Sequence, residues 1–246
     1  MSLPVFVHPV VADVAPGGQV VLDGDEARHA VVVKRIRVGE RVALTDGAGT
    51  TVAGTVSAVE GKASLTLDVE EATTAEIELP RVVVVQAIPK GDRGELAVEM
   101  LTEVGVDLIV PWAASRSVAV WKGDRAAKSL ARWRATARES AKQARRTWFP
   151  EVAEPVGTDE VVALLEKASV PVVLHEAASG PLADLPVPGR GEIVIVVGPE
   201  GGISDEELAA FAAVGAEPVR LGSSVLRTST AGVAATAALL ARTRWR

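Results

Sequence analysis

The 246-residue sequence contains no cysteine and only three histidines. The absence of cysteine excludes a disulfide framework, a thiolate metal site and a thiol nucleophile. The histidines, His8, His29 and His175, stand far apart and show no ligand spacing. We therefore expect no metal ion in this protein.

Long apolar segments are also missing. The first residues, Met1 to Val7, have neither the basic region nor the long apolar region of a signal peptide. No apolar run approaches the length needed to cross a bilayer. The sequence therefore predicts a cytoplasmic protein without a membrane partner.

Basic residues are outnumbered by acidic ones, and the formal net charge is −6. This balance taken alone argues against a nucleic-acid partner, because such proteins usually carry a basic surface. The basic residues are clustered, however. Residues 116–146 contain ten basic and two acidic residues, and residues 28–41 contain five and one. This asymmetry predicts that particular surfaces bind an anionic polymer.

The first 73 residues contain short apolar runs separated by turns. Strands are predicted at 5–7, 19–22, 41–45, 51–56 and 63–67, and a helix at 25–35. Strands of this length and spacing predict a small barrel.

After a polar stretch at 70–78, strand and helix patterns alternate. Strands are predicted at 81–85, 108–110, 170–174, 193–197 and 218–221, and helices at 94–105, 124–145, 160–168 and 229–245. The alternation predicts an α/β domain over residues 74–246, with a mostly parallel sheet and helices on both faces.

Two glycine-bearing loops follow strands near the end of the chain, at 198–202 and 221–228. The first leads into a capping box formed by Ser204 and Glu207. Ligands collect at the carboxyl ends of strands in open α/β sheets, so two such loops side by side predict a pocket. Neither loop has a phosphate-binding or dinucleotide-binding pattern, which indicates a different ligand. The alternative is that both are ordinary turns.

The sequences of these loops resemble the RsmE family, RNA methyltransferases of the SPOUT superfamily. The resemblance rests on Val197-Gly198-Pro199-Glu200-Gly201-Gly202-Ile203-Ser204, then Leu221-Gly222 and Val225-Leu226-Arg227-Thr228. It covers nearly the whole chain, with further matches at His29, Val33 to Gly39, Ile88 to Asp92, Glu103, Gly105, Val106, Pro111, Arg116, Ser117, Glu139, Gln143, Arg146 and Pro150. One position departs from it. Ser229 stands where the family usually has glutamate, and we assign Ser229 no catalytic task.

The resemblance implies an S-adenosyl-L-methionine-dependent methyltransferase that acts on uracil N3 in 16S ribosomal RNA, as free RNA or in the 30S subunit. It implies a PUA-like RNA-binding domain over 1–73 and a trefoil-knot SPOUT domain over 74–246. Three alternatives stay open: a SPOUT enzyme with another RNA target, a non-catalytic ribosome-assembly factor, and a small-molecule enzyme that binds a nucleotide in the pocket.

Methylation of uracil N3 requires loss of its proton and stabilisation of negative charge on the flanking oxygens. Arg227 is the predicted catalytic residue because a positioned cation stabilises such charge, although a cap or an ion pair at the last helix is the alternative. The cofactor carries its own leaving group, so no enzyme nucleophile is needed. The predicted cofactor-binding residues are Leu174, His175, Glu176, Gly198, Pro199, Glu200, Gly201, Gly202, Ile203, Leu221, Gly222, Val225, Leu226, Thr228 and Thr230. His175 is equally well read as a locally bonded strand-end residue, and Glu200 as a ribose ligand or a helix cap.

The helix predicted from Asp124 has an apolar face and a cationic ridge. The apolar face comprises Ala126, Leu130, Trp133, Ala137, Ala141 and Ala144, and the ridge Arg125, Lys128, Arg132, Arg138, Lys142 and Arg145. Aromatic side chains beside such charges stack on unpaired bases, and Trp148 is the better candidate for exposure than Trp133. The predicted RNA-binding residues are Arg28, Lys34, Arg35, Arg37, Lys90, Arg116, Gln143 and Arg146. Six alanines in the last helix permit close helix packing, and we expect a homodimer with the pocket near its interface.

Overall fold

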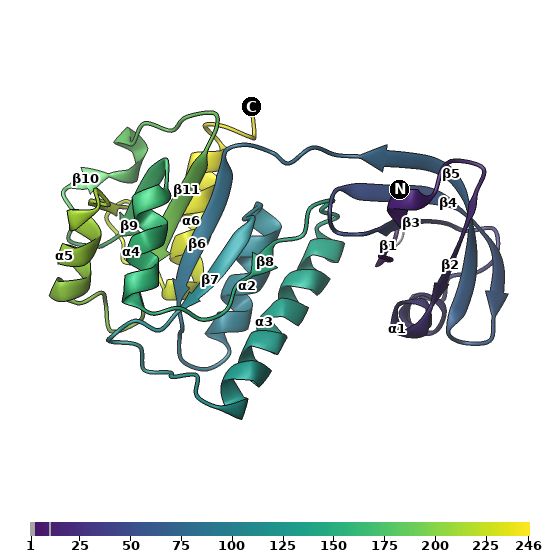
Figure 1. The fold of residues 1–246 in the computed structure, drawn as a ribbon, viewed down its shortest axis with the longest axis horizontal. Coiled ribbons are helices and arrows are strands. Elements are labelled where there is room, and N and C mark those ends of the chain that lie inside the picture. The colour runs from purple at the N-terminus through teal and green to yellow at the C-terminus, as the bar shows by residue number, and fades with distance from the viewer. Residues whose placement is uncertain (1–2, 10) are drawn as a thin grey trace. The chain divides into compact units, whose positions relative to one another are not determined.

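The structure is a computed structural model that describes residues 3–9 and 11–246 (Figure 1). The chain divides into two compact units. The first comprises the residues up to Ile77 together with Ala141–Phe149, and the second comprises Glu78–Ser140 and Pro150–Arg246. The sequence predicted a single boundary after residue 73 and did not foresee that 141–149 would join the first unit.

The first unit is built on a curled five-stranded sheet. Its strands are β1 (Val5–Val7), β2 (Gln19–Asp23), β3 (Arg41–Thr45), β4 (Thr50–Glu60) and β5 (Ser64–Thr74), in the order β1-β3-β4-β5-β2. β1 pairs with β3 in parallel, and the other pairs are antiparallel. Alternate residues of these strands point into one core, which contains Phe6, Leu22, Leu44, Val52, Val56 and Leu67.

Two features of the first unit differ from the prediction. β5 continues to Thr74, into the stretch predicted as a polar connection. The predicted helix at 25–35 is shorter and changes type: α1 (Gly24–Arg28) runs into a π-helical turn at His29–Val33. A short 3-10 turn at Val11–Asp13 was not predicted.

The segment 141–149 packs within the first unit through its side chains. Lys142 Nζ donates to Glu26 Oε1 at 2.9 Å, and only 2% of the Lys142 side chain is exposed. Trp148 Nε1 donates to the Ala75 carbonyl at 2.9 Å. The placement of Lys142 on the cationic ridge was therefore wrong, because its side chain is buried. Trp148 is half-buried with a bonded indole and is more exposed than Trp133, which is 2% exposed, so the predicted order of their exposure is confirmed.

The second unit contains a seven-stranded parallel sheet. Its strands are β6 (Arg81–Ala87), β7 (Leu108–Trp112), β8 (Glu151–Val152), β9 (Val170–Leu174), β10 (Gly180–Pro181), β11 (Glu192–Val197) and β12 (Pro218–Arg220), in the order β10-β12-β9-β11-β6-β7-β8. The central strands are buried on both faces, which explains their unbroken valine and isoleucine runs. The two-residue strands β8 and β10 were not predicted.

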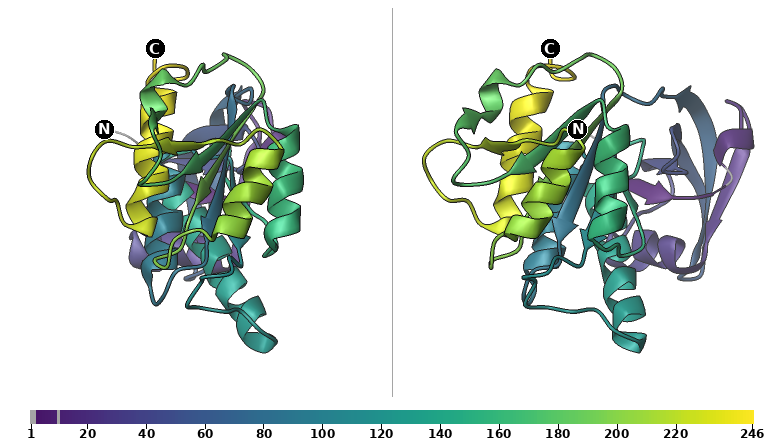
Figure 2. Two further views of the ribbon diagram at one scale, coloured as in Figure 1. Left: turned by 90° about the vertical axis from the view of Figure 1, so that its left-hand side faces the viewer. Right: turned by 60° about the vertical axis from the view of Figure 1, so that its left-hand side comes forward.

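Helices cover both faces of this sheet (Figures 1 and 2). α2 (Arg93–Val104), α6 (Thr228–Leu240) and the first part of α3 (Asp124–Gln143) share one core with the sheet. α4 (Thr158–Lys167) and α5 (Asp205–Ala213) share the core on the opposite face. A 3-10 turn, Leu182–Asp184, follows β10. Among the described residues, no helix has the length and apolar character needed to span a membrane.

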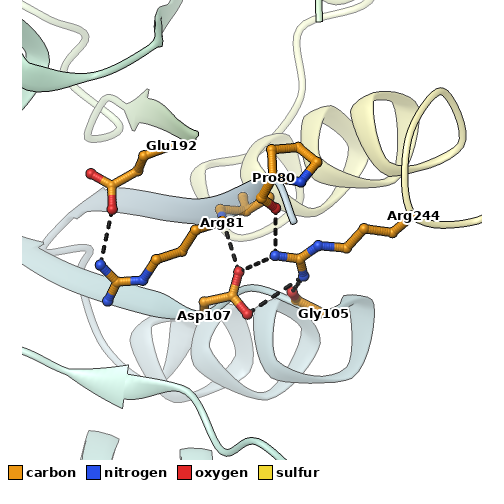
Figure 3. Close-up of polar contacts among 7 residues, drawn as sticks. Pro80, Arg81, Gly105, Asp107, Glu192 and Arg244 are labelled. Carbon is orange, nitrogen blue, oxygen red and sulfur yellow. Dashed lines mark hydrogen bonds and ion pairs between the residues drawn. The ribbon is translucent and has the colours of Figure 1, made fainter. Parts of the chain in front are cut away.

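α6 ends at Leu240, five residues before the predicted end, and the turns after it are fixed by Arg244. Figure 3 shows the Arg244 guanidinium facing Asp107 and the carbonyl oxygens of Pro80 and Gly105. It donates to both carbonyls and to both carboxylate oxygens of Asp107. Only 4% of the Arg244 side chain and 14% of the Asp107 side chain are exposed. The last residues are thereby bonded to the start of β6 and to the α2–β7 turn.

Candidate active site

A pocket of about 360 Å³ lies at the carboxyl edge of the second unit's sheet. β12, β9 and β11 are neighbours in the sheet, and the loops that follow them supply most of the lining. Arg93, at the start of α2, lines the side next to β6. The parallel order of the strands therefore brings together the two loops that the sequence singled out.

Thirteen of the fifteen predicted cofactor-binding residues line this pocket: Leu174, His175, Glu176, Gly198, Pro199, Glu200, Gly202, Ile203, Leu221, Gly222, Val225, Leu226 and Thr228. Gly201 and Thr230 are not in the lining. The Thr230 hydroxyl instead donates to the Arg227 carbonyl at 3.2 Å. Six lining residues were not among the predictions: Arg93, Val197, Arg220, Ser223, Ser224 and Ala231.

The first loop requires glycine at two positions of its turn. A Cβ on Gly198 would lie 2.7 Å from Ile203 Cγ1, and Gly202 has a φ of +76°. Side chains other than glycine are strained at such a positive φ. The turn of this loop, which lines the pocket, therefore depends on glycine at both positions.

The capping box after the first loop is present as predicted. The Ser204 hydroxyl accepts from the Glu207 N–H at 3.2 Å, and Glu207 Oε2 accepts from the Ser204 N–H at 3.0 Å. Glu207 Oε1 also accepts from the Ser115 N–H at 2.8 Å and from the Thr158 hydroxyl at 3.2 Å. Burial would raise the pKa of Glu207, but these hydrogen bonds outweigh it and hold the pKa below its ordinary value.

We expect Glu207→Gln to lower the free energy of unfolding by about 2 kcal/mol at pH 7, the usual size of a hydrogen-bond contribution from a charged group. The amide nitrogen would face a backbone N–H that now has a carboxylate acceptor. Because the pKa is lower in the folded chain, the carboxylate stabilises the fold above the ordinary glutamate pKa. This contribution disappears as the pH falls through the folded-state value. Urea unfolding at pH 7 and in acid measures this, with the exposed Glu217→Gln as control, and equal midpoints at pH 7 would contradict it.

A buried polar chain joins the second loop to the first. Gln86, near the end of β6, is 1% exposed, and its Nε2 donates to Thr228 Oγ1 at 2.9 Å. The Thr228 hydroxyl donates to the Gly198 carbonyl at 2.9 Å. These hydrogen bonds set the start of α6 against the first loop. Sequence reasoning missed Gln86, although a lone glutamine in an otherwise apolar strand was a usable signal.

Arg227 lines the pocket and is exposed. It occupies the N-cap position of α6, but its side chain makes no capping hydrogen bond. Its carbonyl accepts from the Thr230 and Ala231 N–H groups instead. In the part of the chain that the structure describes, its guanidinium has no ion-pair or hydrogen-bond partner, so the alternative of a capping or ion-pair role finds no contact to support it.

His175 and Glu200 both line the pocket; His175 makes a local contact, and Glu200 contacts the segment that follows β6. His175 Nδ1 accepts from the Ala177 N–H at 3.2 Å, which places the proton of the neutral ring on Nε2. Glu200 Oε1 accepts from the Lys90 N–H at 3.3 Å and lies 3.5 Å from Arg93 Nη1. Glu200 thus holds the loop after β6 beside the pocket.

The predicted RNA-binding residues fall in both units. Arg28, Lys34, Arg35 and Arg37 are exposed around α1 and the π-helical turn, and Gln143 and Arg146 belong to the same unit through the segment 141–149. Lys90 and Arg116 are exposed in the second unit. Arg116 Nη1 donates to the carbonyl of Ile203, a pocket residue, at 3.4 Å.

Both units match known domain families. An RNA methyltransferase domain matches residues 76–240, and an RNA methyltransferase PUA domain matches residues 22–70. Ribosomal RNA small subunit methyltransferase E of Mycobacterium tuberculosis is 42% identical over 93% of this chain and 89% of the relative. The protein of that name from Bacillus subtilis is 28% identical over 89% of this chain and 88% of its own length.

Solved structures give the same result. Ribosomal RNA small subunit methyltransferase E from Neisseria gonorrhoeae, bound to S-adenosyl methionine, matches with a TM-score of 0.87 and 29% identity over 98% of both chains. A Legionella pneumophila protein solved with the same cofactor gives 0.88 and 28% over 99% of both. These likenesses confirm the predicted α/β SPOUT methyltransferase domain with a mostly parallel sheet, together with a PUA-like barrel. The chain therefore belongs to the ribosomal RNA small subunit methyltransferase E family of RNA methyltransferases, the RsmE family that its loop sequences resemble.

Proposed function

We propose that this protein transfers the methyl group of S-adenosyl-L-methionine to N3 of a uridine in 16S ribosomal RNA. The observation that carries the proposal is the position of Arg227, a cation without a described partner at the wall of the pocket formed by the two loops. The names of the relatives and the cofactor in their structures support the reaction class. They also support a place of action in the cytoplasm, where ribosomal RNA is modified.

The pocket residues fit this cofactor. Gly198, Gly202 and Gly222 leave backbone groups open, while Leu174 and Leu226 supply apolar walls. The carboxylates of Glu176 and Glu200 suit a ligand that carries positive charge and hydroxyl groups. The bound cofactor would supply a methyl group attached to a sulfonium, and the rest of the cofactor would be the leaving group.

The residues of this chain then have two tasks. The Gln86–Thr228–Gly198 hydrogen bonds keep the two loops in register around the methyl donor. Arg227 donates to a uracil oxygen and stabilises the negative charge that develops when the N3 proton leaves. Because a guanidinium offers hydrogen-bond donors and no acceptor, Arg227 stabilises charge and does not act as the base.

The reaction is tested by methyl transfer from labelled cofactor to small ribosomal subunits that lack the modification. We expect 3-methyluridine to appear in 16S RNA with the wild-type protein and to be missing from a strain without the gene. If the 3-methyluridine content of that strain is unchanged, the assigned reaction is wrong. A methylated nucleoside of another kind would favour the alternative of a different RNA target.

We propose that this chain also binds a second copy of itself and forms a homodimer. α6 packs against α2, and its outer side carries small residues three or four positions apart, Ala231, Ala234 and Ala238. Ala231 also lines the pocket. A second chain that covers this side would therefore lie at the rim of the pocket.

We expect Ala238→Glu to weaken the dimer at least tenfold, because Ala238 is exposed and a carboxylate would be buried without a partner in a helix–helix contact. Sedimentation over a concentration series measures the effect. Glu160→Ala on the exposed side of α4 is the control, and we expect it to leave the association unchanged. A wild-type protein that sediments as a monomer at all concentrations would rule out the homodimer.

A further inference from the structure

A second pocket, of about 270 Å³, lies in the methyltransferase unit outside the cofactor pocket. It is bounded by the loop after β6, by the first turn of α2, and by Trp121 and the first half of α3. Its lining combines aromatic side chains with charged ones, among them Trp121, Trp133, Asp92, Glu95 and Arg132. The proposed reaction gives this pocket no role.

The aromatic wall of the pocket is fixed in place. Trp133 is 2% exposed, and a Cβ on Gly94 would lie 2.7 Å from its indole, so α2 and α3 approach closely only because residue 94 is glycine. Trp121 stands edge-on to Trp133, with ring centroids 5.0 Å apart and an interplanar angle of 80°. Trp121 is only half-buried. A flat ring system is therefore held in advance at the side of an open pocket.

Charged groups surround this ring. Arg132 Nη1 lies 3.5 Å from Glu95 Oε1, and 67% of the Arg132 side chain is exposed. So loose an ion pair contributes little and is readily exchanged for a ligand. Arg125 and Lys128 are exposed on the same helix, which places positive charge along one side. Asp92 is exposed and makes no capping hydrogen bond to α2, so the pocket also offers carboxylate acceptors.

The second pocket adjoins the cofactor pocket through a single chain segment. Arg93 lines the cofactor pocket, while Asp92 and Gly94 on either side of it line the second pocket. Glu200 contacts both the Lys90 N–H and the Arg93 guanidinium, which holds this segment against the first loop. A polymer with its reacting unit in the cofactor pocket would place a neighbouring unit beside the second.

We infer that the second pocket binds an unpaired nucleobase next to the target uridine. This inference rests on the proposed function. The base would stack on Trp121, as unpaired RNA bases do on aromatic side chains. Carboxylates accept hydrogen bonds from the amino groups of bases, so Asp92 and Glu95 favour adenine, cytosine or guanine over uracil. Arg125, Lys128 and Arg132 on α3 would contact the phosphates, which position RNA without specifying sequence.

The test combines Trp121→Ala with single abasic nucleotides at each position flanking the target uridine in a 16S RNA fragment. Stacking on an aromatic side chain contributes about 1–3 kcal/mol per base, so we expect Trp121→Ala to raise the KM for RNA about tenfold or more with kcat little changed. At one flanking position, an abasic nucleotide should raise the KM of the wild-type protein by a similar factor. The same abasic nucleotide should not raise the KM of Trp121→Ala any further, because the stacking contact is already lost. Trp121→Phe should retain most of the RNA affinity, and Val120→Ala, an exposed neighbour outside the pocket, should behave as wild type.

Calorimetry with S-adenosyl-L-methionine separates this inference from the proposed function. If the wild-type protein binds cofactor and methylates the RNA, and Trp121→Ala responds to every abasic position as wild type does, the second pocket does not hold a base. If Trp121→Ala lowers the thermal stability, Asp92→Ala, at an exposed position, replaces it in the same set of measurements with abasic RNA. A change in the sedimenting mass of Trp121→Ala would assign the pocket to contact between copies of the chain and overturn the inference.

Discussion

Arg227→Ala is expected to reduce methyl transfer to ribosomal RNA by about a hundredfold or more, the usual effect of removing one preorganised donor from a developing negative charge. Binding of S-adenosyl-L-methionine should change little, because the proposed partner of the guanidinium is the uracil and the two pocket loops stay joined through Thr228. Single-turnover rates with labelled cofactor and small subunits measure the first quantity. Calorimetry measures the second.

Two further variants make this prediction specific to Arg227. Arg227→Lys keeps the charge but loses the planar two-pronged donor, so we expect it to recover only part of the rate. Arg190→Ala, at an exposed bend outside the pocket, is the control for removal of an arginine. Equal rates for wild type and Arg227→Ala would remove Arg227 from the mechanism.

Arg244→Ala is expected to cost about 3–5 kcal/mol of unfolding free energy, the usual cost of leaving one member of a buried ion pair alone. Asp107 would lose its cation in a position where 14% of its side chain is exposed, and the carbonyls of Pro80 and Gly105 would lose a donor. Figure 3 shows how these acceptors converge on one guanidinium. Urea unfolding followed by circular dichroism measures the loss.

Matched changes at the same end of the chain decide whether the effect belongs to this cluster. Arg246→Ala removes an exposed arginine two residues away and should leave the midpoint unchanged. Arg244→Lys should be nearly as harmful as alanine, since an ammonium cannot reach two carbonyls and both carboxylate oxygens at once. A wild-type midpoint for Arg244→Ala would show that the turns after α6 do not support the sheet.

The pocket loops could be predicted because the residues that form them, and the strand and helix on either side, follow one another in the sequence. The apolar run 193–197 predicted a buried strand, and Ser204 and Glu207 predicted the helix start, so the carboxyl-edge position of the first loop followed. Gln86 escaped because its partner Thr228 is 142 residues away. Contacts of that kind depend on strand order, which periodicity does not reveal.

Sequence patterns failed where tertiary contacts override them. Lys142 continued the spacing of the cationic ridge, yet a carboxylate 116 residues earlier, Glu26, pairs with it and permits its burial. The last helix was predicted to reach residue 245, and its alanine and arginine residues are good helix formers. The helix ends at Leu240. After it, Arg242 donates to the Leu185 carbonyl and Arg244 pairs with Asp107.

The PUA-like unit is made of two separate segments of the chain, and this limits how the protein can be truncated or recombined. A gene fragment that stops at Ile77 would encode every strand of its sheet but omit Lys142, Trp148 and Phe149. Glu26 would then lack its ammonium, and the hairpin glycines Gly47 and Gly49 would lose the rings that cover them. A single genetic crossover therefore cannot exchange this PUA-like unit between proteins. An autonomous version needs a linker that returns residues 141–149 to the end of β5.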